Sequence, residues 1–315
     1  MKSVTITDKD LVRLIDERTN TEASGVLQFE GVDVPVILLR SEAPGPVVWV
    51  EAALHGDEND GTAACLRLRS RLQGKLLRGT LILMPAANPD AYRNGLLGSP
   101  KDGKNLNRMG GSTEDVFSAR WFKRLSSMIE RSADVFADLH GGGRWLDVVP
   151  FAMVFPGDEA SLEIARSLDV DFIAKNPGTS TLVSVFSRRG IPSVLLESGC
   201  GSSLREDAVE RHCRNVLRIL ELKGMINGVN RIRQISPKTL SVLKDFYFPE
   251  DGALIWAAPV GAKLRKGDLI ARYAGWPGLE VHELRSPVPE GVLLSVHTSS
   301  LIRKGAYAAL IGAAS

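Results

Sequence analysis

The sequence contains few cysteines: only Cys65, Cys200 and Cys213 occur among its 315 residues. Their number is odd and no two form a CxxC pair, so neither a disulfide framework nor a cysteine-rich structural zinc site is expected. The chain also lacks any run of about eighteen apolar residues, so no transmembrane helix is expected. Its first ten residues, MKSVTITDKD, lack the apolar core of a signal peptide. These absences predict a cytoplasmic protein without a membrane partner.

Neither sign of charge dominates the sequence. There are 39 basic and 37 acidic residues, which gives a net charge of +2. This balance gives no reason to expect nucleic acid as a partner. The short basic run of Arg67, Arg69 and Arg71 is interpreted as a solvated helix face.

Apolar and amphipathic segments alternate through most of the chain. Segments rich in Val, Leu, Ile and Ala are predicted to be buried strands: residues 44–56, 79–89, 134–142 and 191–201. Segments with apolar residues at helical spacing are predicted helices: residues 58–73, 115–132, 161–170 and 204–226. The alternation predicts an α/β fold, with a mostly parallel mixed sheet and helices on both faces.

The pattern changes near residue 238. From there on, short segments of strand type are separated by Gly and Pro, and no helical pattern occurs. We therefore predict a large α/β domain at residues 1–238 and a small all-β domain at residues 239–315.

The motif HGDE, at residues 55–58, follows the first predicted strand. At this spacing, His55 and Glu58 can point to one spot beyond the carboxyl end of the strand, where open α/β sheets build their sites. A pair of this kind is weak support by itself, because it arises easily by chance.

His140 ends another predicted strand and is followed by three glycines. If the two strands end at the same edge of the sheet, then His55, Glu58 and His140 form a three-ligand set with a fourth position for water, as in catalytic zinc sites. Asp138 lies two residues earlier on the same side of the strand and can accept the spare N–H of a ligand histidine. Alone, His140 is interpreted more simply as a histidine satisfied within the core.

Glu197 ends a further predicted strand. A carboxylate in such a place is costly unless it has a partner or a function. Near a metal-activated water it can act as the general base and then pass the proton to the leaving nitrogen. The alternative is a buried glutamate paired with Arg188 or Arg189.

The motif NLNR, at residues 105–108, lies in a predicted long loop at 95–113. Long loops inside compact domains tend to be functional. Arg108 offers a bidentate fork for a carboxylate, with Asn107 as a neutral donor beside it. The alternative is an ordinary surface loop.

HGDE, NPDAYRNG with NLNR, DLHGG and LLESG, in this order and at these intervals, resemble the succinylglutamate desuccinylase/aspartoacylase family of the zinc carboxypeptidase superfamily. The resemblance covers about residues 45–225. It implies one zinc ion bound by His55, Glu58 and His140, with Glu197 as base and acid. It further implies that Asn107 and Arg108 hold the carboxylate of a small N-acyl amino acid, whose amide bond is hydrolysed.

The sequence departs from the family pattern before NLNR. Members often carry an arginine there, in a stretch such as GTRFSP, which stabilises the oxyanion. Here the stretch is GLLGSP, with Leu97 at that position. Arg93 is then the expected replacement, and Arg188 is expected to bind an acyl or carboxylate group. The C-terminal region is similar to biotinyl/lipoyl-like barrels without a convincing Met-Lys tip.

Two other functions remain open at this stage. One is a non-catalytic protein that binds zinc or an acidic ligand, and the other is a carboxypeptidase that acts on peptides. The sequence is compatible with a homo-oligomer, and it does not identify the acyl group or the amino acid.

Overall fold

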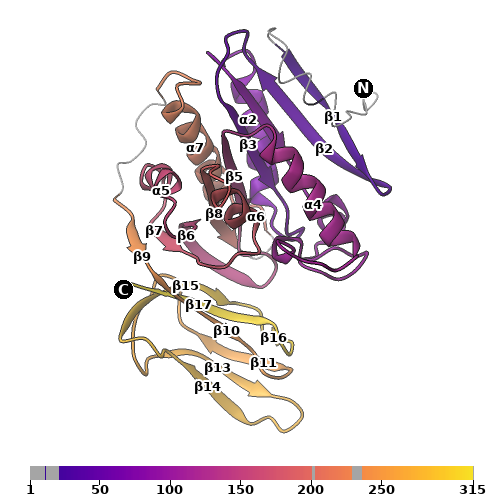
Figure 1. Cartoon of the computed structure of the whole chain (residues 1–315). Coiled ribbons are helices and arrows are strands. Elements are labelled where there is room, and N and C mark those ends of the chain that lie inside the picture. The colour runs from indigo at the N-terminus through magenta and orange to yellow at the C-terminus, as the bar shows by residue number, and fades with distance from the viewer. Residues whose placement is uncertain (1–10, 12–20, 201–202, 229–235, 315) are drawn as a thin grey trace.

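The computed structural model describes residue 11 and residues 21–200, 203–228 and 236–314. They form an α/β part and a β-rich C-terminal part, which adjoin one another (Figure 1). The first ten residues, for which no signal peptide is expected, lie outside these ranges. Within the ranges, no helix is both long and apolar enough to cross a membrane.

Strands and helices alternate in the α/β part, whereas the C-terminal part consists of strands. The strands of the α/β part are β1 (Thr21–Phe29), β2 (Val32–Arg40), β3 (Val47–Ala52), β4 (Thr80–Met84), β5 (Val135–His140), β6 (Leu146–Val154), β7 (Phe172–Lys175) and β8 (Ser193–Cys200). Its helices are α2 (Asp60–Leu72), α3 (Pro89–Asn94), the 3-10 helix η1 (Leu106–Arg108), α4 (Phe117–Glu130), α5 (Glu159–Arg166), α6 (Leu182–Ser187) and α7 (Glu206–Leu222). The strands of the C-terminal part are β9 (Lys238–Leu240), β10 (Val242–Tyr247), β11 (Gly252–Ala257), β12 (Lys263–Arg265), β13 (Leu269–Gly275), β14 (Val281–Arg285), β15 (Glu290–His297), β16 (Leu301–Ile302) and β17 (Tyr307–Ala313).

The middle of the large sheet consists of parallel strands in the order β4-β3-β5-β8. β2 and β1 extend it on one side, and β6 pairs antiparallel with β8 on the other. Every residue of β3, β4 and β5 is buried. This is why their sequences are apolar throughout instead of alternating, as expected for parallel strands between two layers of helices.

Successive residues of the central strands face opposite helical layers. On one face, Trp49 and Phe136 pack in a cluster with residues of α4 and α6. On the other face, Val48 and Ala137 pack with residues of α2 and α7. Helices therefore cover both faces, and the predicted mixed α/β fold is confirmed.

The C-terminal part continues the large sheet. β15 pairs antiparallel with β6, with Ser295 opposite Val148, and β17 and β10 follow it. A second sheet contains four strands in the order β14-β13-β11-β16. The predicted all-β character is confirmed for residues 236–314. The boundary at 238/239 and the barrel likeness stay predictions.

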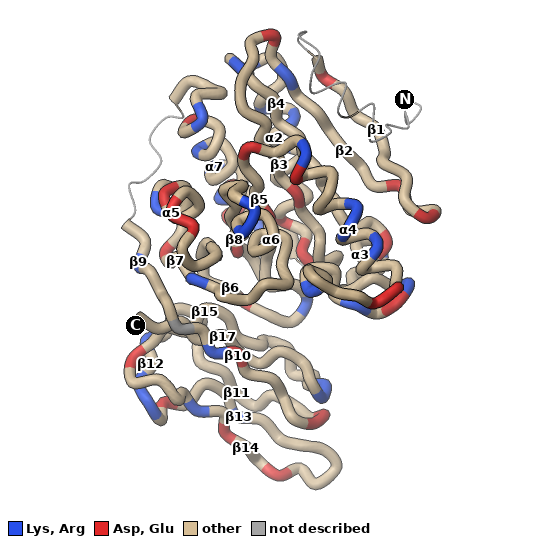
Figure 2. Tube along the Cα trace, in the orientation of Figure 1, with Lys and Arg blue, Asp and Glu red and all other residues tan. Residues whose placement is uncertain are grey.

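Acidic and basic residues are interspersed along both parts of the chain (Figure 2). The basic run of α2 follows this pattern: Arg67 and Arg71 pair with Glu210 of α7, and Arg69 pairs with Glu22 of β1. Such exposed ion pairs contribute little to stability.

Candidate metal centre and cavity

The carboxyl ends of β3 and β5 bring the predicted metal ligands together beside Glu197, which lies within β8 and not at its end as predicted. In the register of the parallel strands, His140 at the end of β5 lies opposite Glu197 of β8. After β3 the chain turns sharply at Ala53, whose φ of 49° lies in the left-handed region that residues with a side chain rarely adopt. Gly56 then passes so close to α3 that a Cβ there would lie 2.0 Å from the carbonyl carbon of Ala91. The HGDE turn therefore requires its glycine.

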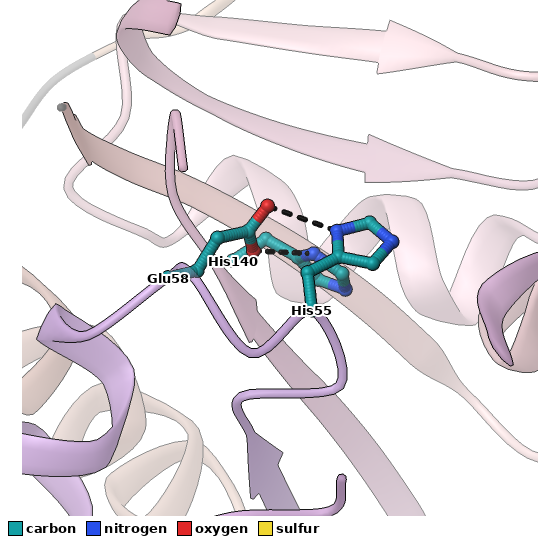
Figure 3. A group of neighbouring side chains, drawn as sticks. All are labelled: His55, Glu58 and His140. Carbon is teal, nitrogen blue, oxygen red and sulfur yellow. Dashed lines mark hydrogen bonds and ion pairs between the residues drawn. The ribbon is translucent and has the colours of Figure 1, made fainter. Parts of the chain in front are cut away.

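His55, Glu58 and His140 converge on one point (Figure 3). Nδ1 of His55 lies 2.9 Å from Oε1 of Glu58, and Nδ1 of His140 lies 2.8 Å from Oε2 of the same carboxylate. One donor atom from each residue falls within 4.8 Å of the others. Ligand atoms around a tetrahedral zinc ion lie roughly 3.3 Å apart, so small side-chain movements suffice to admit an ion.

The outer nitrogens of both histidines are held by acceptor groups. Nε2 of His55 lies 3.0 Å from Oδ1 of Asn105, and Nε2 of His140 lies 2.8 Å from Oδ2 of Asp138. A histidine that donates its Nε2–H leaves Nδ1 free as a metal ligand. The predicted position of Asp138 behind His140 agrees with this contact.

The charges of this cluster suit a cation. Burial alone would raise the pKa of Glu58, but the neighbouring His140 and His55 hold it well below its usual range. Burial alone would lower the pKa of His140, yet Asp138 and Glu58 raise it well above its usual range. A protonated imidazole therefore supplies the positive charge that the two carboxylates require, and a divalent cation bound to Nδ1 would supply it instead.

Glu197 lies beside this cluster and lines the same cavity. Its Oε2 is buried and has no hydrogen-bond partner within the described residues. Burial and the nearby charge of Glu58 raise the pKa of Glu197 to about 8. The alternative pairing is not observed, because Arg188 is exposed at the end of α6 and Arg189 pairs with Glu130.

The two NLNR residues expected to bind substrate differ in their surroundings. The Asn107 side chain is buried: its Nδ2 donates to Oδ2 of Asp138 at 3.4 Å, and its Oδ1 accepts the N–H of Leu182 at 3.0 Å. Arg108 is exposed, lines the cavity and donates one N–H to the carbonyl oxygen of Asn107. Asn107 therefore binds Asp138 and the start of α6, whereas Arg108 keeps further N–H donors for a ligand.

The other two arginines expected at the site lie elsewhere. The side chain of Arg93 is 62% exposed and pairs with Asp90 of its own helix at 2.9 Å. Neither Arg93 nor Arg188 lines the cavity, whereas Leu97 does. Among the described residues that line it, Arg108 is the one arginine or lysine.

The cavity has a volume of about 820 Å³ and lies between the α/β part and the C-terminal part. Its size is typical of pockets for small molecules. The C-terminal part contributes polar and aromatic side chains that the sequence analysis did not identify. They are Ser241, Asp245, Tyr247, Ser295, His297 and Tyr307. No local motif marks them, because they are single residues in or next to strands of ordinary composition.

Glu51 is a second buried carboxyl group near the metal centre. It is fully buried on β3, and neither of its oxygens has a hydrogen-bond partner within the described residues. In the sheet register it lies opposite Asp138. Burial, and then the charge of Asp138, raise the pKa of Glu51 well above its usual range, so the group is held as a neutral acid.

We expect Glu51→Gln to gain stability relative to the wild type as the pH rises. In the unfolded chain Glu51 ionises near the ordinary value of about 4.3, whereas in the folded protein it stays protonated to higher pH. Between the two pKa values, rising pH therefore lowers wild-type stability by up to about 1.4 kcal/mol per pH unit. Glutamine has no such proton to lose. Urea unfolding at about pH 4 and about pH 7 measures the difference.

The matched control is Glu163→Gln, because Glu163 is exposed on α5. Its stability relative to the wild type should not change with pH. If the stability difference between Glu51→Gln and the wild type is also independent of pH, then Glu51 is not held as a neutral acid.

Comparison with known proteins supports the sequence resemblance. The family model described as the succinylglutamate desuccinylase/aspartoacylase catalytic domain matches residues 44–223. Among curated proteins, the N-alpha-acetyl-L-2,4-diaminobutyric acid deacetylase of Halomonas elongata is 30% identical over 211 residues. The match spans 62% of this chain and 60% of that protein, which is less than two thirds of its length.

Two solved structures share the fold over almost the whole chain. The product-bound ectoine utilization protein EutE (DoeB) from Ruegeria pomeroyi has a TM-score of 0.80 and 23% identity, covering 93% of this chain and 94% of that one. The succinylglutamate desuccinylase/aspartoacylase from Rhodobacter sphaeroides has a TM-score of 0.81 and 24% identity, covering 96% and 98%. At such identities the likeness shows the fold alone.

Proposed function

Because the chain belongs to the succinylglutamate desuccinylase/aspartoacylase family, we propose that it is a zinc-dependent hydrolase that cleaves the amide bond of a small N-acyl amino acid. One observation carries the proposal. A His-Glu-His set and a half-buried glutamate with one buried oxygen, unpartnered among the described residues, meet in one cavity of small-molecule size. The deacetylase of Halomonas elongata, by its name, acts on a compound of this class.

The donor set of His55, Glu58 and His140 fits zinc. Two imidazole nitrogens and one carboxylate leave a position open, as catalytic zinc sites require, and acceptors behind both rings fix their orientation. When bound there, zinc polarises the substrate carbonyl and lowers the pKa of water.

Two side chains of the cavity, Arg108 and Glu197, provide substrate binding and proton transfer. Arg108 holds the substrate carboxylate through its guanidinium fork, which places the amide bond between the metal ligands and Glu197. The Glu197 carboxylate accepts a proton from the attacking water and delivers it to the departing amine. Arg93 and Arg188 receive no role, because neither lines the cavity.

The C-terminal part also bears on the choice between small and large substrates. β10, β15 and β17 contribute residues to the cavity and so form part of its wall. A cavity of about 820 Å³ accommodates an acyl amino acid more readily than a long peptide. This favours a deacylase over a carboxypeptidase.

A substrate panel combined with metal analysis tests the proposal. The purified protein should contain zinc and should release free amino acid from some members of a set of N-acetyl, N-succinyl and N-aspartyl amino acids. Release of C-terminal residues from peptides alone would identify a carboxypeptidase. Binding without turnover in the presence of zinc would identify a non-catalytic binding protein.

A further inference from the structure

The charged groups that line the cavity are unequal in number. The acidic residues are Asp57, Glu58, Glu197 and Asp245, against which Arg108 is the one arginine or lysine among the described lining residues. Glu58 belongs to the metal centre, Glu197 faces the reacting bond, and Asp57 accepts the N–H of Arg144 at 2.9 Å. Asp245 is therefore the lining carboxylate to which the proposed function assigns no role.

Asp245 is held in place by a neighbour on the adjacent strand. Tyr307 of β17 donates its hydroxyl hydrogen to Oδ1 of Asp245 on β10. Burial and the nearby Asp245 raise the pKa of Tyr307, so the hydroxyl remains a donor at neutral pH. The ring of Tyr307 meets that of Tyr247 edge to face, with 5.1 Å between centroids. The Asp245 carboxylate is thus held by a support that consists of β10, β17 and the rings of Tyr247 and Tyr307.

This support and Glu197 line the same cavity. The charge of Glu197 contributes to the raised pKa of Tyr307, which places the two groups within electrostatic range of one another. Burial and Asp245 raise the pKa of Tyr247, and the charge of Arg108 opposes this rise, so Arg108 is also within electrostatic range. Arg108, Glu197 and Asp245 line one cavity, so the side chain of a substrate held there by Arg108 can reach Asp245.

We propose that Asp245, oriented by Tyr307, binds a positively charged side chain of the substrate, so that the preferred substrates are N-acyl amino acids with an ammonium or guanidinium group. This inference rests on the proposed function. Asp245 is exposed in the free protein, and a carboxylate at the cavity wall attracts a cation and repels an anion. Substrates with acidic acyl groups or acidic side chains, such as succinyl and aspartyl compounds, are disfavoured for the same reason.

The test compares substrates of equal shape and different charge. Nα-acetylornithine and Nα-acetylnorleucine differ mainly in a terminal ammonium in place of a methyl group, and N-acetylglutamate supplies an acidic side chain. The wild type should use acetylornithine about 10- to 100-fold more efficiently than acetylnorleucine, and acetylglutamate least of all. Nα-acetylarginine distinguishes a guanidinium preference from an ammonium preference.

Variants connect the preference to the residue. Asp245→Asn should raise KM for acetylornithine about 10- to 100-fold, with little change in kcat, and should leave acetylnorleucine unaffected. Asp245→Lys should reverse the order in favour of acetylglutamate. Lys244→Gln is the matched control, because Lys244 directly precedes Asp245 in β10, is exposed and does not line the cavity. It should leave all values unchanged.

A binding measurement keeps this inference separate from the proposed function. Calorimetry with the zinc-loaded Glu197→Gln protein reports affinity without turnover. If the wild type hydrolyses nothing but that protein still binds acetylornithine more tightly than acetylnorleucine, the proposed function fails and the inference stands. Equal affinities, or an Asp245→Asn substitution that leaves the preference intact, would overturn the inference while hydrolysis remained in place.

Discussion

Glu197→Gln is expected to lower kcat by about a thousandfold, within the usual range for the loss of a general base. Glutamine has the size and shape of glutamate but cannot accept a proton from water. Glu197 is not one of the three converging ligand residues, so zinc content should remain that of the wild type. Steady-state hydrolysis of the best panel substrate, with metal analysis of the same preparation, measures both quantities.

The pH dependence of the wild type gives an independent view of the same group. Only the deprotonated carboxylate can act as a base, so activity should fall on the acid side as Glu197 gains its proton. Without a metal, burial and Glu58 raise its pKa to about 8. A divalent cation beside it stabilises the carboxylate and lowers this pKa, which moves the acid limb below that value.

The control for Glu197→Gln is again the exposed Glu163→Gln, which should keep full activity. If Glu197→Gln is as active as this control, then another group is the base. If it loses zinc together with activity, then Glu197 serves the metal centre and the assigned division of roles is wrong.

The parts of the site that the sequence predicted are those fixed by local geometry. His55 and Glu58 lie three residues apart, and His140 at the end of β5 lies opposite Glu197 within the neighbouring parallel strand β8. Apolar segments of the right length are enough to predict such strands, and the carboxyl ends of parallel strands meet at one edge. The central α/β fold was predictable for the same reason.

The position of Arg93 could not be predicted from local sequence patterns. The sequence pattern predicted a strand at residues 79–89 and no element at residues 90–94, whereas β4 ends at Met84 and α3 occupies Pro89–Asn94. Asn88 begins this short helix by accepting the N–H of Ala91, and Arg93 then pairs with Asp90 one turn earlier. A helix of less than two turns carries too little periodicity to be predicted. Its orientation turns Arg93 toward solvent.

Asp245 and Tyr307 show a second limit. They reach the cavity because β15 pairs with β6, which continues the central sheet into the C-terminal part. That pairing joins residues about 150 positions apart and depends on the packing of whole strands. No spacing within the sequence encodes it, so the sequence without its fold gives no sign that these side chains line the same cavity as Glu197.

His55→Gln is expected to abolish zinc binding at micromolar metal and to reduce hydrolysis to background. The substitution removes one of three ligand atoms from a site whose affinity depends on the complete set. His55 is a better choice than His140, because its side chain is 12% exposed against 2% and replacement disturbs the core less. Thermal unfolding with and without zinc supplies a readout that needs no substrate. A ligand at about a hundred times its Kd stabilises the folded state by about 2.7 kcal/mol, and this gain should vanish in the variant.

His282→Gln is the matched control, since His282 lies on β14, pairs with Glu250 and does not line the cavity. It should bind zinc, show the same thermal shift as the wild type and retain activity. A His55→Gln protein that keeps both its zinc and its thermal shift would place the metal elsewhere. In that event Glu58 and His140 would be left as an ion pair of the apo fold, with Glu197 beside them and no metal to serve, and the hydrolase assignment would fail with the site.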